Sequence, residues 1–302
     1  MFKKILIKYY YKKANNYLYN YNNKKAIYYL DKILKIDENN IEALLLKGTC
    51  HSNLLEKNES IECFDKCFKI NKEDLNVYLK KGIAYYNLSE YEEAINCFNK
   101  IIEFYPNNDY TLNYIGSCYL NLEKYDLAFK CFNDILKIDS ENIETLINLS
   151  LYYNDLDQCD EALKCLNKCL EINPNEAGAM LQKAIIYKNK VDYENALKYI
   201  NMALEINPDD ITLKLLKYFF LANLGKFELS LSGFEKIRNE YFDDCLSINL
   251  YSFYYASALK VMGKYDKALE VLNEYLEKYP NFHEEYILDE KDEILELMSE
   301  KN

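Results

Sequence analysis

All four prolines of this chain stand at one position of a 34-residue period. When Ala177 is counted as position 1 of a unit, Pro106, Pro174, Pro208 and Pro280 each fall at position 32 of their units. Proline ends a helix because its ring lacks the amide hydrogen and clashes with the preceding turn. Helix-ending residues that recur at a fixed interval predict that the chain is an array of copies of one short unit. Without that pattern, a length of 302 residues would suggest two globular domains.

The unit reads as a hairpin of two amphipathic helices. In Ala177–Asp210, apolar residues recur at helical spacing on both sides of a polar break at residues 189–192. Position 20 is small in every unit, and position 24 is always aromatic or aliphatic. Small residues let the two helices approach closely, and the larger residue fills the space beside them. Position 8 holds Ala14, Gly48, Gly82, Gly116, Ser150, Ala184, Tyr218 and Ala256, and position 24 holds Leu30, Phe64, Phe98, Phe132, Leu166, Ile200, Phe234 and Leu272.

The pattern divides the chain into eight units. Residues 1–6 form a lead-in to the first helix, and four extra residues, 245–248, precede the last unit. An insertion of about one helical turn either lengthens a helix or loosens a loop. Residues 283–302 form an amphipathic, acidic segment that we expect to be a C-terminal capping helix, because an array needs a polar cover at its end. The units span residues 7–40, 41–74, 75–108, 109–142, 143–176, 177–210, 211–244 and 249–282.

The period and the residue ladders resemble the tetratricopeptide repeat. The resemblance extends from residue 7 to residue 282, although position 4 never carries the tryptophan of the family pattern. It implies an all-α fold, an α–α superhelix (solenoid) of eight helical hairpins with a C-terminal capping helix. It also implies a concave groove, lined by the first helix of each unit, that binds an extended or helical peptide.

Helix geometry indicates which side chains line that groove. At 100° per residue, positions 6, 9 and 13 of the first helix lie almost opposite the core positions 4, 8 and 11. An asparagine ladder at position 13 has two readings: it pairs with a bound peptide backbone, or it ends helices by tolerating the left-handed conformation. The expected groove residues are Lys80, Tyr114, Asn148 and Gln182 at position 6, Ile83, Ser117, Leu151, Ile185 and Phe219 at position 9, and Asn87, Asn121, Asn189 and Asn223 at position 13.

The charge distribution is uneven. The net charge of −12 argues against nucleic acid, which requires a basic stripe. Residues 1–40, however, carry nine lysines against three acidic residues, a net of +6, which leaves −18 on the remainder. This start is either a solvated face or an end that meets an acidic partner or membrane surface.

No constellation for catalysis, a metal or a cofactor is visible. Ten cysteines recur mainly at positions 23 and 27, and we expect buried thiols in a reducing cytoplasm. The pairs Cys63/Cys67 and Cys165/Cys169 lack two further ligands at zinc spacing. The N-terminus lacks the apolar core of a secretion signal, and no stretch is long enough for a membrane span. The sequence therefore predicts a cytoplasmic, non-enzymatic protein without metal or cofactor.

The function that these features predict is that of an interaction scaffold or adaptor that binds a peptide segment of another protein. One alternative is a regulatory or substrate-recruiting subunit of a separate enzyme. The third possibility is a helical-repeat protein that binds nucleic acid, but the net negative charge of the chain argues against it.

Overall fold

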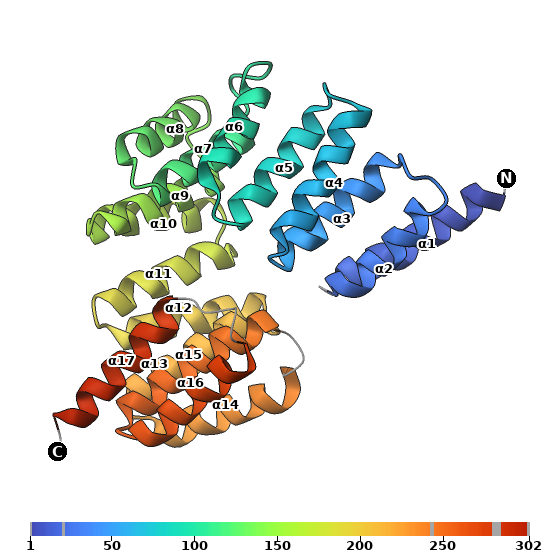
Figure 1. Ribbon diagram of the computed structural model, residues 1–302. Helices are drawn as coiled ribbons and strands as arrows, with labels where there is room; N and C mark the ends of the chain where they lie inside the picture. The colour runs from blue at the N-terminus through green and yellow to red at the C-terminus, as the bar shows by residue number, and fades with distance from the viewer. Residues whose placement is uncertain (1, 20–21, 242–244, 280–284, 301–302) are drawn as a thin grey trace. The chain divides into compact units, whose positions relative to one another are not determined.

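The computed structural model describes residues 2–19, 22–241, 245–279 and 285–300 (Figure 1). Within these ranges every regular element is an α-helix, as the sequence predicts. The helices are α1 (Phe2–Tyr19), α2 (Asn23–Leu34), α3 (Ile41–Asn53), α4 (Lys57–Ile70), α5 (Leu75–Asn87), α6 (Tyr91–Ile102), α7 (Asp109–Asn121), α8 (Tyr125–Ile138), α9 (Ile143–Asp155), α10 (Cys159–Ile172), α11 (Ala177–Asn189), α12 (Tyr193–Ile206), α13 (Ile211–Asn223), α14 (Phe227–Tyr241), α15 (Cys245–Val261), α16 (Tyr265–Lys278) and α17 (Glu285–Ser299).

Contacts group the chain into two compact units, residues 1–152 and 153–302, with the division inside α9. In the first unit, α1 pairs with α2, α3 with α4, α5 with α6 and α7 with α8, and first helices of successive hairpins also touch, as α3 and α5 do. In the second unit, α11 pairs with α12, α13 with α14 and α15 with α16. Helix α1 includes residues 2–6, which the sequence assigned to a lead-in.

The last residue of most units caps the next helix. This residue, at position 34, precedes the helix in extended backbone, and its side-chain oxygen accepts a hydrogen bond from an amide of the first turn. Asn40 Oδ1 accepts from the amide of Ala43 at 3.1 Å, and Asp210 Oδ1 accepts from the amide of Leu213 at 3.0 Å. Each cap satisfies a backbone donor that the helix leaves without a partner.

The turns inside the hairpins, as far as they are described, share one backbone conformation. The amide at position 16 donates to the carbonyl at position 11, as from Glu90 to Tyr85 at 2.9 Å and from Asp192 to Tyr187 at 2.9 Å. In the seven hairpins whose position 15 the structure describes, this residue is left-handed, with φ between 55° and 72°. This is the usual end of a helix in a left-handed residue. The left-handed residues are Leu55, Ser89, Glu123, Asp157, Val191, Gly225 and Gly263.

The core of a hairpin depends on complementary sizes at positions 8 and 24. Phe64, Phe98 and Phe132 are fully buried, and each ring lies over the glycine at position 8 of its own hairpin. In the seventh unit the arrangement is inverted. Tyr218 occupies the small position, and a Cβ on Gly233 would lie 2.1 Å from its ring, so the space for Tyr218 comes from a glycine on the partner helix.

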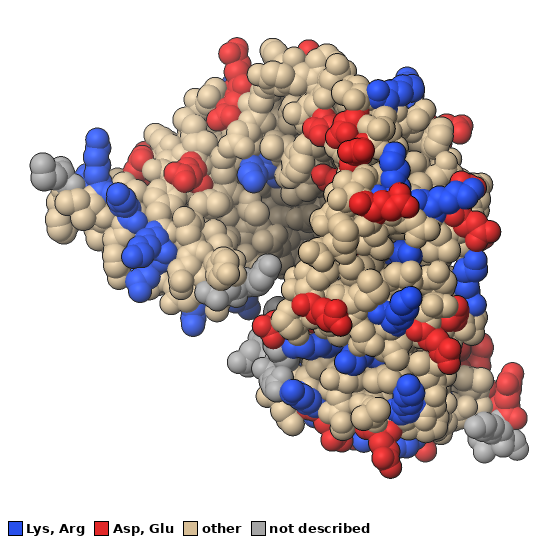
Figure 2. Space-filling view, turned by 180° about the vertical axis from the view of Figure 1, so that it is seen from behind, with Lys and Arg blue, Asp and Glu red and all other residues tan. Residues whose placement is uncertain are grey.

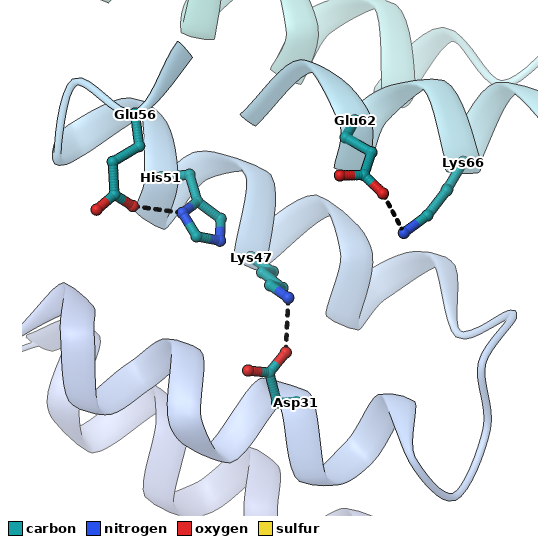
Figure 3. Close-up of polar contacts among 6 residues, drawn as sticks. All are labelled: Asp31, Lys47, His51, Glu56, Glu62 and Lys66. Atoms are coloured by element: carbon teal, nitrogen blue, oxygen red, sulfur yellow. Dashed lines mark hydrogen bonds and ion pairs between the residues drawn. The ribbon is translucent and has the colours of Figure 1, made fainter. Parts of the chain in front are cut away.

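Polar clasps join successive hairpins. The lysine at position 7 of a first helix reaches position 25 of the preceding second helix: Lys47 Nζ lies 2.6 Å from Asp31 Oδ1 (Figure 3). Lys81 Nζ lies 2.7 Å from Asp65 Oδ1 in the same way. Lys183, only 5% exposed, donates to Asn167 Oδ1 at 2.6 Å. These contacts fix the register between neighbouring hairpins with directional bonds.

The inserted residues and the predicted capping segment lie in the second unit. Residues 245–248 lie at the start of α15, which at 17 residues is about one turn longer than the 13-residue first helices of most other hairpins. Helix α17 packs against α15 and α16 and buries Ile287 and Ile294 completely. Lys260 Nζ lies 2.9 Å from both Glu290 Oε1 and Glu293 Oε2 of α17. Burial alone would lower the pKa of Lys260. The hydrogen bonds and charges of these two carboxylates stabilise the protonated amine more strongly, so its pKa is raised.

Candidate functional site

The face that the sequence predicts as a groove belongs to the first helices. In the first unit it comprises residues of α5, α7 and α9, and α5 contacts α7 directly. Lys80, Asn87 and Asn121 are exposed there, whereas Ile83, Tyr114, Ser117, Asn148 and Leu151 are half-buried. None of these eight side chains is sealed in the core. The face therefore presents polar groups beside partly accessible apolar ones.

The second unit shows the same alternation on α11 and α13. Asn189 is exposed, and Gln182, Ile185, Phe219 and Asn223 are half-buried. Phe219 is held on one side by aromatic rings, with its centroid 5.7 Å from both Phe220 and Tyr254. This side chain therefore contributes to packing as well as to the surface. Position 6 of the same helix, Leu216, is only 2% exposed and belongs to the core.

Tyr114 is the centre of an aromatic cluster. Its ring stacks on Phe98 at 5.2 Å between centroids and meets Tyr86 at 5.5 Å and Tyr110 at 5.1 Å, both edge to face. Burial, followed by the hydrogen bond and the charge of Tyr110, raises the pKa of Tyr114 well above the ordinary value. Its hydroxyl stays protonated at neutral pH and can donate to a ligand. Removal of this ring would also open the core beside Phe98.

Asn148 takes part in a buried polar network. Its Nδ2 donates to Asn113 Oδ1 at 3.2 Å, and the hydroxyl of Thr145 donates to the same oxygen at 3.0 Å. Asn113 is 1% exposed, and its Nδ2 has no hydrogen-bond partner among the described residues. A buried donor without a partner is unfavourable. Asn113 lies at position 5, where the other units carry mostly apolar residues, so its polarity is the one signal of this network in the sequence.

The asparagines at position 13 make two kinds of contact. Asn121 Nδ2 donates to the carbonyl of Ser117 at 2.8 Å, and Asn223 Nδ2 donates to that of Phe219 at 3.0 Å. These two amides thus satisfy the ends of their own helices. Asn189 Nδ2 instead lies 3.4 Å from Asn154 Oδ1. Position 13 is the last helical residue, and the left-handed residue stands two positions later, so tolerance of that conformation does not account for the ladder.

Buried thiols give this protein little nucleophilic chemistry. Burial raises the pKa of Cys97 to about 11 and that of Cys118 to about 12, so both are protonated at neutral pH. Within the described ranges no three His, Cys, Asp or Glu side chains are grouped closely enough to hold a metal. His51, half-buried at the end of α3, contacts Glu56 through Nδ1 at 2.5 Å. As far as the helices are described, each is too short or too polar to cross a membrane.

Family models match most of the chain piece by piece. A model described as tetratricopeptide repeat matches residues 109–175, and two others with the same description match residues 177–210 and 251–281. A model described as anaphase-promoting complex, cyclosome, subunit 3 matches residues 19–101. No curated protein matches the sequence.

Solved structures with a similar fold include the following three. TTC0263, a tetratricopeptide-repeat protein of Thermus thermophilus, is 18% identical with a TM-score of 0.54, covering 61% of this chain and 99% of that one. A tetratricopeptide-repeat protein from Parabacteroides merdae is 15% identical with a TM-score of 0.58, covering 96% and 99%. The APC/C hetero-tetramer Cut9–Hcn1 gives 16% identity and a TM-score of 0.59. That match covers 94% of this chain and 55% of the other.

Proposed function

This chain is a tetratricopeptide-repeat protein, and from that premise we propose that it is a non-enzymatic scaffold that binds a peptide segment of a partner along its first-helix face. A scaffold for protein interactions is the role that the repeat family and the APC/C neighbour support. Peptide capture on one face is the finer step, and it rests on the surface described above.

One observation carries the proposal: exposed amides stand beside half-buried apolar side chains on the same helix face. In the first unit, Asn87 and Asn121 are exposed while Ile83 and Leu151 remain half-buried. A peptide needs both kinds of contact, because its backbone requires hydrogen-bond partners and its side chains require apolar surface to bury. The protonated hydroxyl of Tyr114 adds a donor on the same face.

The test uses exposed residues whose loss leaves the core intact. The double variant Asn87→Ala/Asn121→Ala removes two amides from the face. Exposed Asn96 and Asn99 on α6 provide the matched control, Asn96→Ala/Asn99→Ala, which removes two amides from a second helix. Partners recovered from the native cell with the wild-type chain are identified, and the segment bound is mapped and synthesised as a labelled peptide.

We expect the face variant to bind that peptide about tenfold or more weakly, since each amide hydrogen bond contributes about 0.5–1.5 kcal/mol. The control variant should bind like the wild type. Equal binding by both variants would place the site elsewhere. If the partner recovered in stoichiometric amount is an enzyme whose activity changes on binding, the chain serves as a regulatory or recruiting subunit through the same face.

A further inference from the structure

A second surface lies away from the first-helix face. A cleft of about 890 Å³ opens between the C-terminal halves of α2 and α4, and α3 contributes to its lining. Leu34 and Ile70 give it apolar walls, and Ile70 is 40% exposed. Two acidic residues, Asp31 and Glu38, also line it. Its basic residues are five lysines: Lys32, Lys35, Lys47, Lys66 and Lys69. Figure 2 shows basic side chains in succession over the N-terminal helices.

The basic character is specific to the first two hairpins. Positions 26 and 29 on the outer side of a second helix are Lys32 and Lys35 in the first unit and Lys66 and Lys69 in the second. In the third unit the same positions form an ion pair, with Lys100 Nζ 2.7 Å from Glu103 Oε1. In the fourth they form another, between Lys137 and Asp134 at 2.8 Å. The third and fourth hairpins thus pair positions 26 and 29 with each other, whereas both positions are lysines in the first two.

Two of the five cleft lysines have acidic partners, and a third, Lys32, lies over the ring of Tyr28 at 4.3 Å from its centroid. Lys47 pairs with Asp31, and Lys66 Nζ lies 2.7 Å from Glu62 Oε1 on its own helix (Figure 3). The side-chain amines of Lys35 and Lys69 make no hydrogen bond or ion pair within the described part of the chain. They stand at the ends of α2 and α4, on opposite walls of the cleft. Two unneutralised charges on facing walls favour an acidic occupant.

Helix α17 carries a surface of the complementary kind. It contains six acidic residues and one lysine, and it buries Ile287 and Ile294 on one side only. On the other side, Leu288 and Leu295 are 42% and 45% exposed, two turns apart. Asp292 lies between them at helical spacing. Three more exposed carboxylates adjoin this stripe: Glu285, Asp289 and Glu296.

We propose that the cleft between α2 and α4 of one copy of this chain binds the exposed face of α17 of a second copy. Leu288 and Leu295 cover the apolar walls at Leu34 and Ile70, and the carboxylates of Asp289 and Asp292 neutralise Lys35 and Lys69. The two surfaces differ, so the contact is head to tail and leaves a free cleft and a free helix at the ends of the assembly. It leaves the first-helix face open and does not depend on peptide binding there.

Sedimentation velocity of the full chain tests the proposal. We expect the mass-averaged sedimentation coefficient to rise with protein concentration at low salt. Because the contact is largely ionic, the rise should disappear in about 0.5 M NaCl, where the Debye length falls to about 4 Å.

Charge reversals identify the surfaces. Lys35→Glu/Lys69→Glu should weaken the association about tenfold or more, corresponding to about 1.4 kcal/mol. The matched control, Lys100→Glu/Lys137→Glu, makes the same charge change on α6 and α8 and should leave the association as it is in the wild type. Asp289→Lys/Asp292→Lys should weaken it like the cleft variant. Mixing the cleft variant with the α17 variant should restore association, because each supplies the charges that the other requires.

Three results would overturn the proposal. The first is a chain that stays monomeric at every concentration and salt. The second is an association that the α6/α8 control weakens as much as the cleft variant does. The third is a pair of reversed variants that fail to associate when mixed, although circular dichroism shows both to be folded.

Discussion

A Cβ on Gly82 would lie 2.6 Å from Cε1 of Phe98, closer than two carbon atoms approach in a relaxed structure. The same relation holds between Gly48 and Phe64 and between Gly116 and Phe132. Where position 24 is aliphatic, position 8 carries alanine or serine instead, as in Ala184 with Ile200. Size at one position therefore limits size at the other, except in the seventh unit, where Gly233 provides the space for Tyr218.

Gly82→Ala should destabilise the protein by about 1–3 kcal/mol, because the added methyl overpacks a buried ring. In the double variant Gly82→Ala/Phe98→Leu, which copies the combination at Ala14 and Leu30, the methyl has room. Urea unfolding followed by circular dichroism should then show a total loss smaller than the sum of the two single losses. Strict additivity would mean that the two residues do not compete for space.

Val191→Gly should stabilise the protein by about 0.5–1 kcal/mol. Glycine relieves the strain of a left-handed L-residue, which costs about 1–2 kcal/mol. Part of this gain is lost because glycine gives the unfolded chain more conformational freedom. Val191 is β-branched and left-handed with φ of 59°, and its side chain is 70% exposed, so it loses little packing. Gly225→Val, at the equivalent turn of the next hairpin, is the matched reverse change and should destabilise. The melting temperatures of both variants check the signs, and a gain from Gly225→Val would refute the argument.

The clasps should differ in their response to salt. Lys183→Ala should cost about 2 kcal/mol, because the buried amine donates to Asn167 and lies 4.3 Å from the centroid of the Tyr199 ring. Lys47→Ala should cost only about 0.5 kcal/mol, because its ion pair with Asp31 is partly exposed. Unfolding in about 0.1 M and 0.5 M NaCl should reduce the second loss and leave the first unchanged. Equal salt responses would contradict the difference in burial.

Lys188→Met should raise stability at neutral pH. Burial lowers the pKa of Lys188 below its ordinary value, so the folded state binds this proton less tightly than the unfolded chain does. The charged amine therefore destabilises the fold below its folded-state pKa, and the loss is relieved as pH rises from there toward the ordinary lysine pKa. Urea unfolding of both proteins at about pH 7 and about pH 10.4 should show the advantage of methionine shrinking at the higher pH. An advantage that grows with pH would reverse the sign and refute the cause.

Much of the fold could be predicted from residue spacing, because the packing of the helices depends on the size of the side chain at particular positions of the unit, and these sizes can be read from one sequence. The turn conformation did not follow. Only Gly225 and Gly263 mark position 15 as left-handed, whereas Glu123 and Val191 give no local signal there. The backbone hydrogen bond from position 16 to position 11 enforces that conformation whatever the residue.

The candidate face was predictable in placement but not in role. Helical geometry placed Asn87 and Asn121 on the surface, yet it did not reveal that Tyr114 also packs against Phe98. Nor did it indicate the network of Asn113, because that network joins residues 32 positions apart through side-chain hydrogen bonds. The sequence shows that Tyr218 is an exception at position 8. It does not show that Gly233 provides the space for this ring, because that contact joins two different helices of the folded hairpin.

The clasps between position 7 and position 25 mean that the units of this chain are not interchangeable modules. Removal of residues 109–142 would place Leu149, at position 7 of its unit, opposite Asn99 at position 25 of the third unit. This resembles the present pair of Ile115 and Asn99, so no charged partner is lost. Removal of residues 75–108 would instead set Ile115 opposite Asp65 and strand a carboxylate that Lys81 now neutralises. Gain or loss of whole units during evolution is therefore tolerated at some junctions and penalised at others, although the unit length is the same at each.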